Sequence, residues 1–278
     1  IVKSSGRETM TTEQIKGKKM GHIFYITLNR PEKRNAITVE MMTGICEMAE
    51  AQMADPEIRA IIIKAEGPIF SAGIDFMALG AEVGPLMGTA DGGGARLRAL
   101  IHKYQQYMNR LEAVELPIIC AMHGKVLGMG TEMILACDLR VMSTDCRWGL
   151  PELRLGLIAD LGGTTRLTRI VGQARAMEVL MTGNEFSADQ ALSWGLINYV
   201  VAEDELLQTA EKMANDIAKC APLAVGATKK ILKRGEGVDL MTQLDMEVNL
   251  QSILLKTDDC QEGLTAMMEK RAPLWKRR

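Results

Sequence analysis

Three short segments combine glycine or other small residues with acidic side chains, a pattern that suits close contact with a ligand. Residues 70–75 read Phe-Ser-Ala-Gly-Ile-Asp, and their small side chains would let the backbone approach a ligand. Residues 124–132 hold three glycines at the start of a helical pattern, where free N–H groups favour an anion or a developing oxyanion. The segment 150–164 carries Glu152 and Asp160 beside a turn of small residues. Each pattern alone is common, so no single segment defines a site.

Glu132 has the most unusual surroundings of these acids. It lies in 131–136, Thr-Glu-Met-Ile-Leu-Ala, where its neighbours are small or apolar. Burying an unpaired carboxylate is costly, so such a group must be paired or hydrogen-bonded. We therefore predict that Glu132 either has fixed partners or takes part in catalysis.

Strand and helix patterns alternate along the first half of the chain and would position these segments. Runs of β-branched and apolar residues predict strands at 22–28, 59–64, 117–122 and 139–142. Between them, helical spacing of apolar residues predicts helices at 39–53, with Thr38 as N-cap, at 96–113 and at 130–136. This alternation predicts an α/β architecture with right-handed crossovers.

Two further regions differ from this alternation. Residues 80–94 are rich in glycine, and we expect a mobile loop there, either a plain surface excursion or the wall of a pocket. Beyond residue 201, amphipathic spacing predicts a separate helical region with helices at 205–220, 223–234 and 239–255. The apolar faces of these helices need a partner surface, in their own core or on another subunit.

The composition excludes several classes of function. The 278 residues carry 33 Lys+Arg and 35 Asp+Glu, a net charge of -2, so the chain lacks the basic surface that nucleic acids require. The three histidines, at 22, 102 and 123, are not spaced as metal ligands. The six cysteines form no CxxC pair and are typical of buried thiols in a reducing compartment. No apolar run is long enough to span a membrane, and we expect a cytoplasmic protein.

Taken together, the segments 70–75, 124–138 and 150–167 resemble the motifs of the enoyl-CoA hydratase/isomerase (crotonase) superfamily. The similarity extends from 28–36, Leu-Asn-Arg-Pro-Glu-Lys-Arg-Asn-Ala, to 269–273, Glu-Lys-Arg-Ala-Pro, and thus covers nearly the whole chain.

The resemblance implies a crotonase-like α/β fold, a spiral of ββα units, over residues 17–204. A C-terminal helical region at 205–278 would mediate trimerisation, usually in a dimer of trimers. Residues 1–16 would form an N-terminal extension, and the sequence leaves open whether residues 1–9 are native, with Met10 as the natural start.

The resemblance also implies an acyl-CoA thioester substrate and roles for individual residues. The backbone N–H groups of Ile74 and Met129 would form an oxyanion hole for the thioester carbonyl. Glu132 and Glu152 match the two catalytic glutamates of the hydratases, which implies that Glu132 activates water toward C3 and Glu152 delivers a proton to C2. The expected substrate- and CoA-binding residues are Arg34, Ala36, Ala72, Gly73, Ile74, Asp75, Phe76 and Gly130.

Asp160 keeps a second activity open. Residues 158–160, Ile-Ala-Asp, resemble the dienoyl-CoA isomerase branch, in which acids such as Glu152 and Asp160 shuttle a proton between carbons. Alternatively, Asp160 caps its turn or pairs with Arg166. We predict an enoyl-CoA hydratase, with an isomerase as the alternative and a non-catalytic acyl-CoA-binding protein as a third possibility.

Neither reaction is expected to need a metal or a redox cofactor, because coenzyme A is part of the substrate. We expect His123 to be a packed or hydrogen-bonded residue. Fatty-acid β-oxidation is one setting for such an enzyme, but the sequence leaves the pathway and the acyl chain length open.

Overall fold

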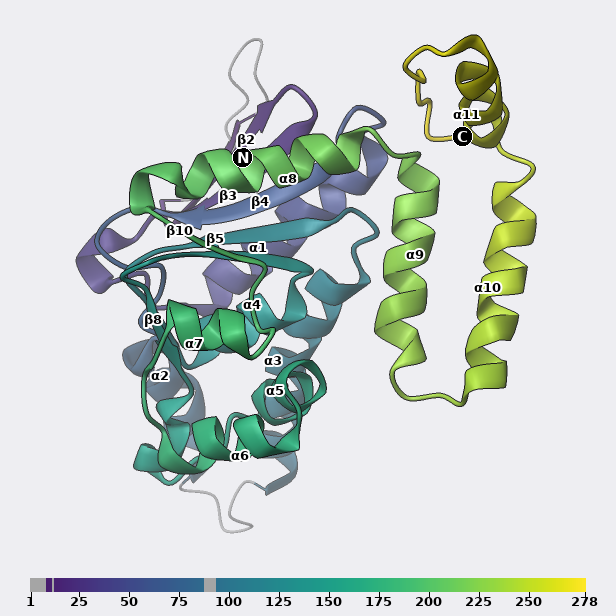
Figure 1. Ribbon diagram of the computed structural model, residues 1–278. Helices are drawn as coiled ribbons and strands as arrows, with labels where there is room; N and C mark the ends of the chain where they lie inside the picture. Colours follow the sequence, from purple (N-terminus) through teal and green to yellow (C-terminus); the bar gives the residue numbers. More distant parts are fainter. Residues whose placement is uncertain (1–8, 12, 88–93) are drawn as a thin grey trace.

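A mixed sheet forms the centre of the computed structural model, which describes residues 9–11, 13–87 and 94–278 (Figure 1). In spatial order its strands are β1 (Thr9–Thr11), β2 (Ile15–Met20), β3 (Ile23–Leu28), β4 (Ala60–Ala65), β5 (Ile118–Met122), β7 (Leu139–Ser143) and β10 (Tyr199–Val201). The pairs β1-β2 and β2-β3 are antiparallel, and every later pair is parallel. The four strands expected from the sequence are confirmed as β3, β4, β5 and β7.

A second, three-stranded sheet lies beside the first and leads into the glycine-rich turn. It pairs β6 (Lys125–Leu127) in parallel with β8 (Arg147–Gly149), which pairs antiparallel with β9 (Phe186–Ser187). An isolated bridge between Ser71 and Val126 places residues 70–75 alongside β6. The small sheet therefore brings two of the glycine-containing segments together.

Helices occupy most of the remaining described chain. The α-helices are α1 (Val39–Ala51), α2 (Phe76–Met87), α3 (Gly94–Ala113), α4 (Met129–Ala136), α5 (Gly163–Val171), α6 (Gln173–Thr182), α7 (Ala188–Ser193), α8 (Leu206–Ala218), α9 (Pro222–Gly235), α10 (Leu240–Leu254) and α11 (Asp258–Glu269). Single 3-10 turns are η1 (Pro31–Lys33), η2 (Gln52–Ala54), η3 (Pro151–Leu155) and η4 (Glu203–Glu205). Thr38 caps α1 as predicted, because its hydroxyl accepts a hydrogen bond from the Met41 amide at 3.2 Å. None of these described helices is long and apolar enough to cross a membrane.

Helix α2 corrects the expectation of a mobile loop at 80–94. Residues 80–87 belong to α2, α3 begins at Gly94, and residues 88–93 lie outside the described chain. The first turn of α2 is capped by Asp75, whose Oδ1 accepts hydrogen bonds from the Met77 and Ala78 amides. This cap and the alanine, methionine and leucine residues within α2 offset the weak helix propensity of its glycines.

The two faces of the large sheet pack against different helices. Side chains alternate along each strand, so Phe24 and Ile26 join the main core with α1, α3 and α4, whereas Tyr25 faces the other way. On that second face α8 covers the sheet with Leu206 and Ala210 (Figure 1). Helix α8, which the sequence placed in the C-terminal helical region, thus completes the core, whereas α9, α10 and α11 lie to one side of the sheet (Figure 1).

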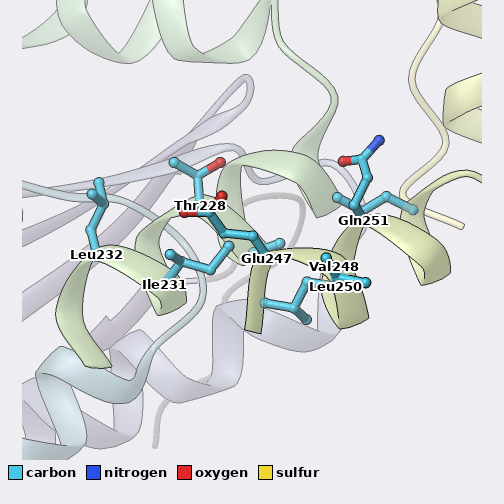
Figure 2. Close-up of a pocket in the computed structure, with 9 residues that line it drawn as sticks. Thr228, Ile231, Leu232, Glu247, Val248, Leu250 and Gln251 are labelled. Carbon is cyan, nitrogen blue, oxygen red and sulfur yellow. The ribbon is translucent and has the colours of Figure 1, made fainter. Parts of the chain in front are cut away.

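Helices α9 and α10 form an antiparallel hairpin beside the core (Figure 1). Between them lies an open groove of about 500 Å³, into which Ile231 and Val248 contribute apolar side chains (Figure 2). No residue of α10 is buried, and Val248 is 67% exposed. The hairpin thus leaves a large apolar surface uncovered within one chain.

Candidate active site

Two backbone segments approach each other closely at the centre of the candidate site. The Ser71 amide donates to the Lys125 carbonyl, and the Leu127 amide donates to the Ser71 carbonyl, both at 3.0 Å. Gly73 has a φ of +100°, and a Cβ there would lie only 3.0 Å from the Leu127 carbonyl oxygen. Only glycine permits this approach, which brings Ile74 toward the start of α4.

The amides of Ile74 and Met129 differ from their neighbours in their hydrogen bonding. On either side of Ile74, the Gly73 amide donates to Ser71 Oγ and the Asp75 amide donates to the Ile37 carbonyl. In the part of the chain that the structure describes, neither the Ile74 nor the Met129 amide has an acceptor within hydrogen-bond range. Met129 opens α4, so its amide lacks an intrahelical acceptor. Both N–H groups therefore lack a protein acceptor, as the donors of an oxyanion hole would before a ligand binds.

Glu132 lies in the first turn of α4 with a carboxylate that is held from one side. The residue is 2% exposed, and its Oε1 accepts hydrogen bonds from the Leu161 amide at 2.8 Å and the Gly163 amide at 3.0 Å. Burial, reinforced by the charge of Glu152, raises the pKa of Glu132 to about 8, although the two amides act in the opposite direction. The predicted fixed partners of Glu132 are therefore confirmed, and its carboxyl can exchange a proton near neutral pH.

Glu152 enters the site from η3, directly after β8. A Cβ on Gly128 would lie 3.0 Å from Glu152 Oε1, so this carboxylate is next to the turn that precedes Met129. Its Oε2 is buried without a hydrogen-bond partner in the described chain. Burial raises the pKa of Glu152, with a further contribution from Asp160. A buried carboxylate oxygen with no protein partner is suited to hold a group of a ligand.

Asp160 lies in the turn that binds Glu132, directly before Leu161. Burial raises the pKa of Asp160, and its charge in turn raises the pKa values of Glu132 and Glu152, so the three acids interact. The residue lines a polar cavity of about 490 Å³ to which neither glutamate contributes. The alternative in which Asp160 pairs with Arg166 is not observed, because Arg166 instead binds Glu112 at 2.6 Å.

The expected CoA-binding segments lie side by side. The Ala72 amide donates to the Arg34 carbonyl at 2.9 Å, and the Ile37 amide donates to the Gly73 carbonyl at 2.7 Å. The Arg34 side chain is exposed, and the Phe76 ring next to this pair of segments is 57% exposed. The surface of these two segments therefore includes Arg34 and Phe76, and the Ile74 amide belongs to the second segment.

Asp75 and its partner hold this surface in place. Asp75 Oδ2 binds the Arg30 guanidinium at 2.6 Å, which together with amide hydrogen bonds lowers the pKa of Asp75. Arg30 also donates to the Ala36 carbonyl at 3.0 Å. The carboxylate of Asp75 is thus fully engaged by the protein and orders the loop rather than offering a free ligand.

Gly130 and Asn35 are needed for packing around the site. A Cβ on Gly130 would lie 2.8 Å from Ser71 Cβ, so glycine lets α4 pack on the 70–75 segment. Asn35 is fully buried in a left-handed conformation, φ +51°, and donates to the carbonyls of Glu66 and Ile69. Sequence reasoning placed no role on the Asn35 side chain, and its only signal was a polar residue after a proline turn.

His123 and the cysteines have structural surroundings. The His123 ring is 9% exposed and its Nε2 is paired with the Gly67 carbonyl at 2.7 Å, which confirms the expected hydrogen-bonded histidine. Four cysteines are buried, but Cys220 is exposed and Cys260 is half-buried, so the expectation that all six are buried is wrong. Among the described residues, no group of three or more His, Cys, Asp or Glu side chains could hold a metal ion.

Comparison with known proteins identifies the family. Residues 18–278 match the family described as enoyl-CoA hydratase/isomerase. The chain is 35% identical over 254 residues to a short-chain-enoyl-CoA hydratase of Clostridium acetobutylicum, covering 91% of this chain and 94% of that protein. It is 32% identical over 266 residues to a peroxisomal Δ(3,5)-Δ(2,4)-dienoyl-CoA isomerase of Arabidopsis thaliana, covering 95% and 96% of the two chains.

A solved structure also matches the chain over nearly its whole length. The crystal structure of an enoyl-CoA hydratase from Bacillus anthracis superimposes with a TM-score of 0.86 at 32% identity, covering 95% of this chain and all of that one. The chain therefore belongs to the enoyl-CoA hydratase/isomerase family and has the crotonase fold, as its motifs predicted. Membership supports an enzyme acting on acyl-CoA thioesters, but both hydratases and isomerases are among the relatives.

Proposed function

We propose that the protein is an enoyl-CoA hydratase, which adds water across the 2,3 double bond of an enoyl-CoA thioester. The observation that carries this proposal is a pair of electrostatically interacting glutamates near the start of α4. Glu132 is held by the amides of Leu161 and Gly163, and Glu152 lies against Gly128 with one buried oxygen unpartnered. Hydration requires a base for the water and an acid for the carbon, and a pair of coupled carboxyls supplies both.

The amides of Ile74 and Met129 are proposed to bind the thioester carbonyl oxygen. Attack of water at C3 gives the thioester enolate character, so negative charge develops on that oxygen. Backbone donors directed at the charge stabilise the transition state, and loss of one such donor typically lowers turnover by about 10²–10³-fold. The segments 34–37 and 72–76 are proposed to hold CoA, with Arg34 facing a phosphate.

Glu132 and Glu152 are proposed to share one proton. The pKa of Glu132 is raised to about 8 by burial and by the charge of Glu152, as expected for a pair of carboxyls that holds one proton at neutral pH. For Glu132 to activate water, the shared proton must lie on Glu152. Glu132 then takes a proton from the water that attacks C3, while Glu152 gives its proton to C2. One water has been added, and the pair again holds a single proton.

The test is the loss of the enoyl-thioester absorbance when the protein is added to crotonyl-CoA and to longer 2-enoyl-CoA substrates. No change with any chain length would overturn the hydratase proposal. Should Glu132→Gln and Glu152→Gln both keep all acyl-CoA-dependent function, a non-catalytic acyl-CoA-binding protein would replace it.

An isomerase of 3,5-dienoyl-CoA thioesters is the second candidate, favoured by the position of Asp160. This carboxyl is half-buried, and its charge contributes to the raised pKa of Glu152, so both acids belong to one group of interacting carboxyls. An isomerase would produce conjugated-diene absorbance without incorporating solvent oxygen. Asp160→Asn should abolish that reaction, whereas a hydratase should retain most of its activity.

The protein is further proposed to self-associate as a trimer or a dimer of trimers through α9–α11. The exposed apolar groove between α9 and α10 supports this proposal. Sedimentation of the purified protein tests it, and a monomer at micromolar concentration would contradict it. The absence of a further cofactor and the cytoplasmic location remain predictions.

A further inference from the structure

The position of the Glu132 carboxylate depends on the turn at 159–163. Both hydrogen bonds to Oε1 come from amides of this turn, those of Leu161 and Gly163. Space around it is tight, because a Cβ on Gly163 would lie 2.6 Å from Ala159 Cβ and 2.9 Å from Glu132 Oε1. Whatever fixes the turn therefore also fixes the carboxylate.

Helix α3 contacts the turn through the same peptide group that binds Glu132. Gln105 Nε2 donates to the Asp160 carbonyl at 2.7 Å. That carbonyl and the Leu161 amide belong to one peptide unit, so Gln105 binds one end while Glu132 Oε1 binds the other. A carbonyl that accepts a hydrogen bond makes the N–H of its own peptide a better donor, because the two bonds polarise the unit in the same direction.

A second anchor holds the next carbonyl of the turn. Arg166 Nη1 donates to the Leu161 carbonyl at 3.3 Å, and Nη2 binds Asn109 at 2.8 Å and Glu112 at 2.6 Å. Gln105, Asn109 and Glu112 have the spacing i, i+4, i+7 and so lie on one face of α3. This face therefore binds one carbonyl of the turn directly, through Gln105, and holds the Arg166 side chain that binds the next one.

We propose that Gln105 is a positioning residue for the reaction, which orients and polarises the Asp160–Leu161 peptide and thereby sets the carboxylate of Glu132, with Arg166 as the second anchor. This inference rests on the proposed function of Glu132. Gln105 is itself oriented, since its Oε1 is paired with His102 Nδ1 at 3.1 Å. Glu152 from η3 and Asp160 from the turn are the other acids that act on Glu132.

The experiment compares Gln105→Met with Gln106→Met. Methionine has nearly the size of glutamine but no N–H donor, and Gln106 is an exposed neighbour on the same helix. The Glu132 carboxyl is titrated by ¹³C NMR in each protein, with its signal assigned by its absence in Glu132→Gln. We expect Gln105→Met to raise the Glu132 pKa above the wild-type value and to lower kcat about tenfold with little change in KM. Gln106→Met should match the wild type.

Equal titration and equal kcat in the two variants would overturn the proposal, as would a loss of thermal stability alone in Gln105→Met. Arg166→Lys is a second test, and we expect it to raise the Glu132 pKa by a smaller amount than Gln105→Met. An unchanged Glu132 pKa in Arg166→Lys would count against the proposal, even if Gln105→Met failed to fold. Because the titration needs no turnover, it tests the role of Gln105 separately from the hydratase activity. If the wild type is inactive toward enoyl-CoA but Gln105→Met still raises the Glu132 pKa, only the proposed function is contradicted.

Discussion

Glu132 and helix α10 lie at opposite extremes of burial in this molecule. Glu132 is 2% exposed and has protein donors on one carboxylate oxygen, whereas α10 has no buried residue and Leu240 is 69% exposed. Burying a carboxyl without hydrogen-bond partners is costly, and the Leu161 and Gly163 amides supply the partners of Glu132. An exposed leucine forfeits about 25 cal/mol per Å² of uncovered area, which a later contact can recover. Glu132 therefore finds its hydrogen-bond donors within this chain, whereas the apolar side chains of α10 stay exposed in it.

Helix α9 shows how the two regions are joined. Lys229 binds the Asp138 carboxylate at 2.6 Å with both side chains nearly buried, and also donates to the Leu116 carbonyl. Lys233 donates to the Cys137 carbonyl, directly after the helix that carries Glu132. One face of α9 is thus held on the core by charge-assisted hydrogen bonds, while Leu232 remains 62% exposed.

The largest effect should follow removal of the buried acid. We expect Glu132→Gln to lower kcat for crotonyl-CoA hydration by about 10²–10⁴-fold, because glutamine keeps the size but cannot exchange a proton. The exposed residue Glu203 supplies the matched control, Glu203→Gln, which should retain full activity. A loss of less than threefold in Glu132→Gln would show that burial of this acid serves packing only.

The pH dependence of the rate should reflect the same burial. Below pH 8 the glutamate pair keeps its shared proton, since the pKa of Glu132 is raised to about 8. Above that pH the proton is lost, so kcat/KM should fall by about tenfold for each pH unit. Initial rates between pH 6 and pH 10 measure the profile. A rate that stays level to pH 10 would contradict the shared proton.

The same substitution at two glycines should have opposite effects on stability. A Cβ at Gly163 would overlap Ala159 and crowd Glu132, so Gly163→Ala should lower the free energy of unfolding by about 1–3 kcal/mol. At Gly80, in α2, a Cβ meets no atom within 4 Å, and Gly80→Ala should raise it by about 0.5–1 kcal/mol. Urea denaturation of both variants gives the comparison, which fails if the two changes have the same sign.

The smallest effect on the fold of one chain should come from the open groove. Val248→Glu places a charge on a side chain that is 67% exposed, so it should change the stability of a single chain by less than about 0.5 kcal/mol. It should nevertheless weaken self-association, measured by sedimentation. Met20→Glu, at a 49% exposed position on β2, is the control and should leave the assembly unchanged. Equal assembly of both variants would place the interface elsewhere.

Local pattern was enough to predict much of the fold. The runs at 22–28 and 59–64 became β3 and β4, and Thr38 caps α1, because runs of β-branched residues and helix capping act over a few residues. The apolar residues on either side of Glu132 likewise indicated that its carboxyl has partners or a catalytic role, but not which residues are the partners. In contrast, 80–87 form a helix despite their glycines, since the Asp75 cap outweighs local propensity there.

Only the tertiary structure decided which groups meet at the acid site. The Leu161 amide lies 29 positions from Glu132 in the sequence, and Gln105 lies 55 positions from the carbonyl it binds. Contacts over such separations depend on the order of the strands and the packing of α3 on the 159–163 turn, which no local spacing encodes. The sequence by itself therefore determined the family, the main elements and the need to satisfy Glu132. Only the tertiary structure decided which groups are the partners of Glu132, because a buried carboxyl needs hydrogen-bond donors that the fold brings close to it in space.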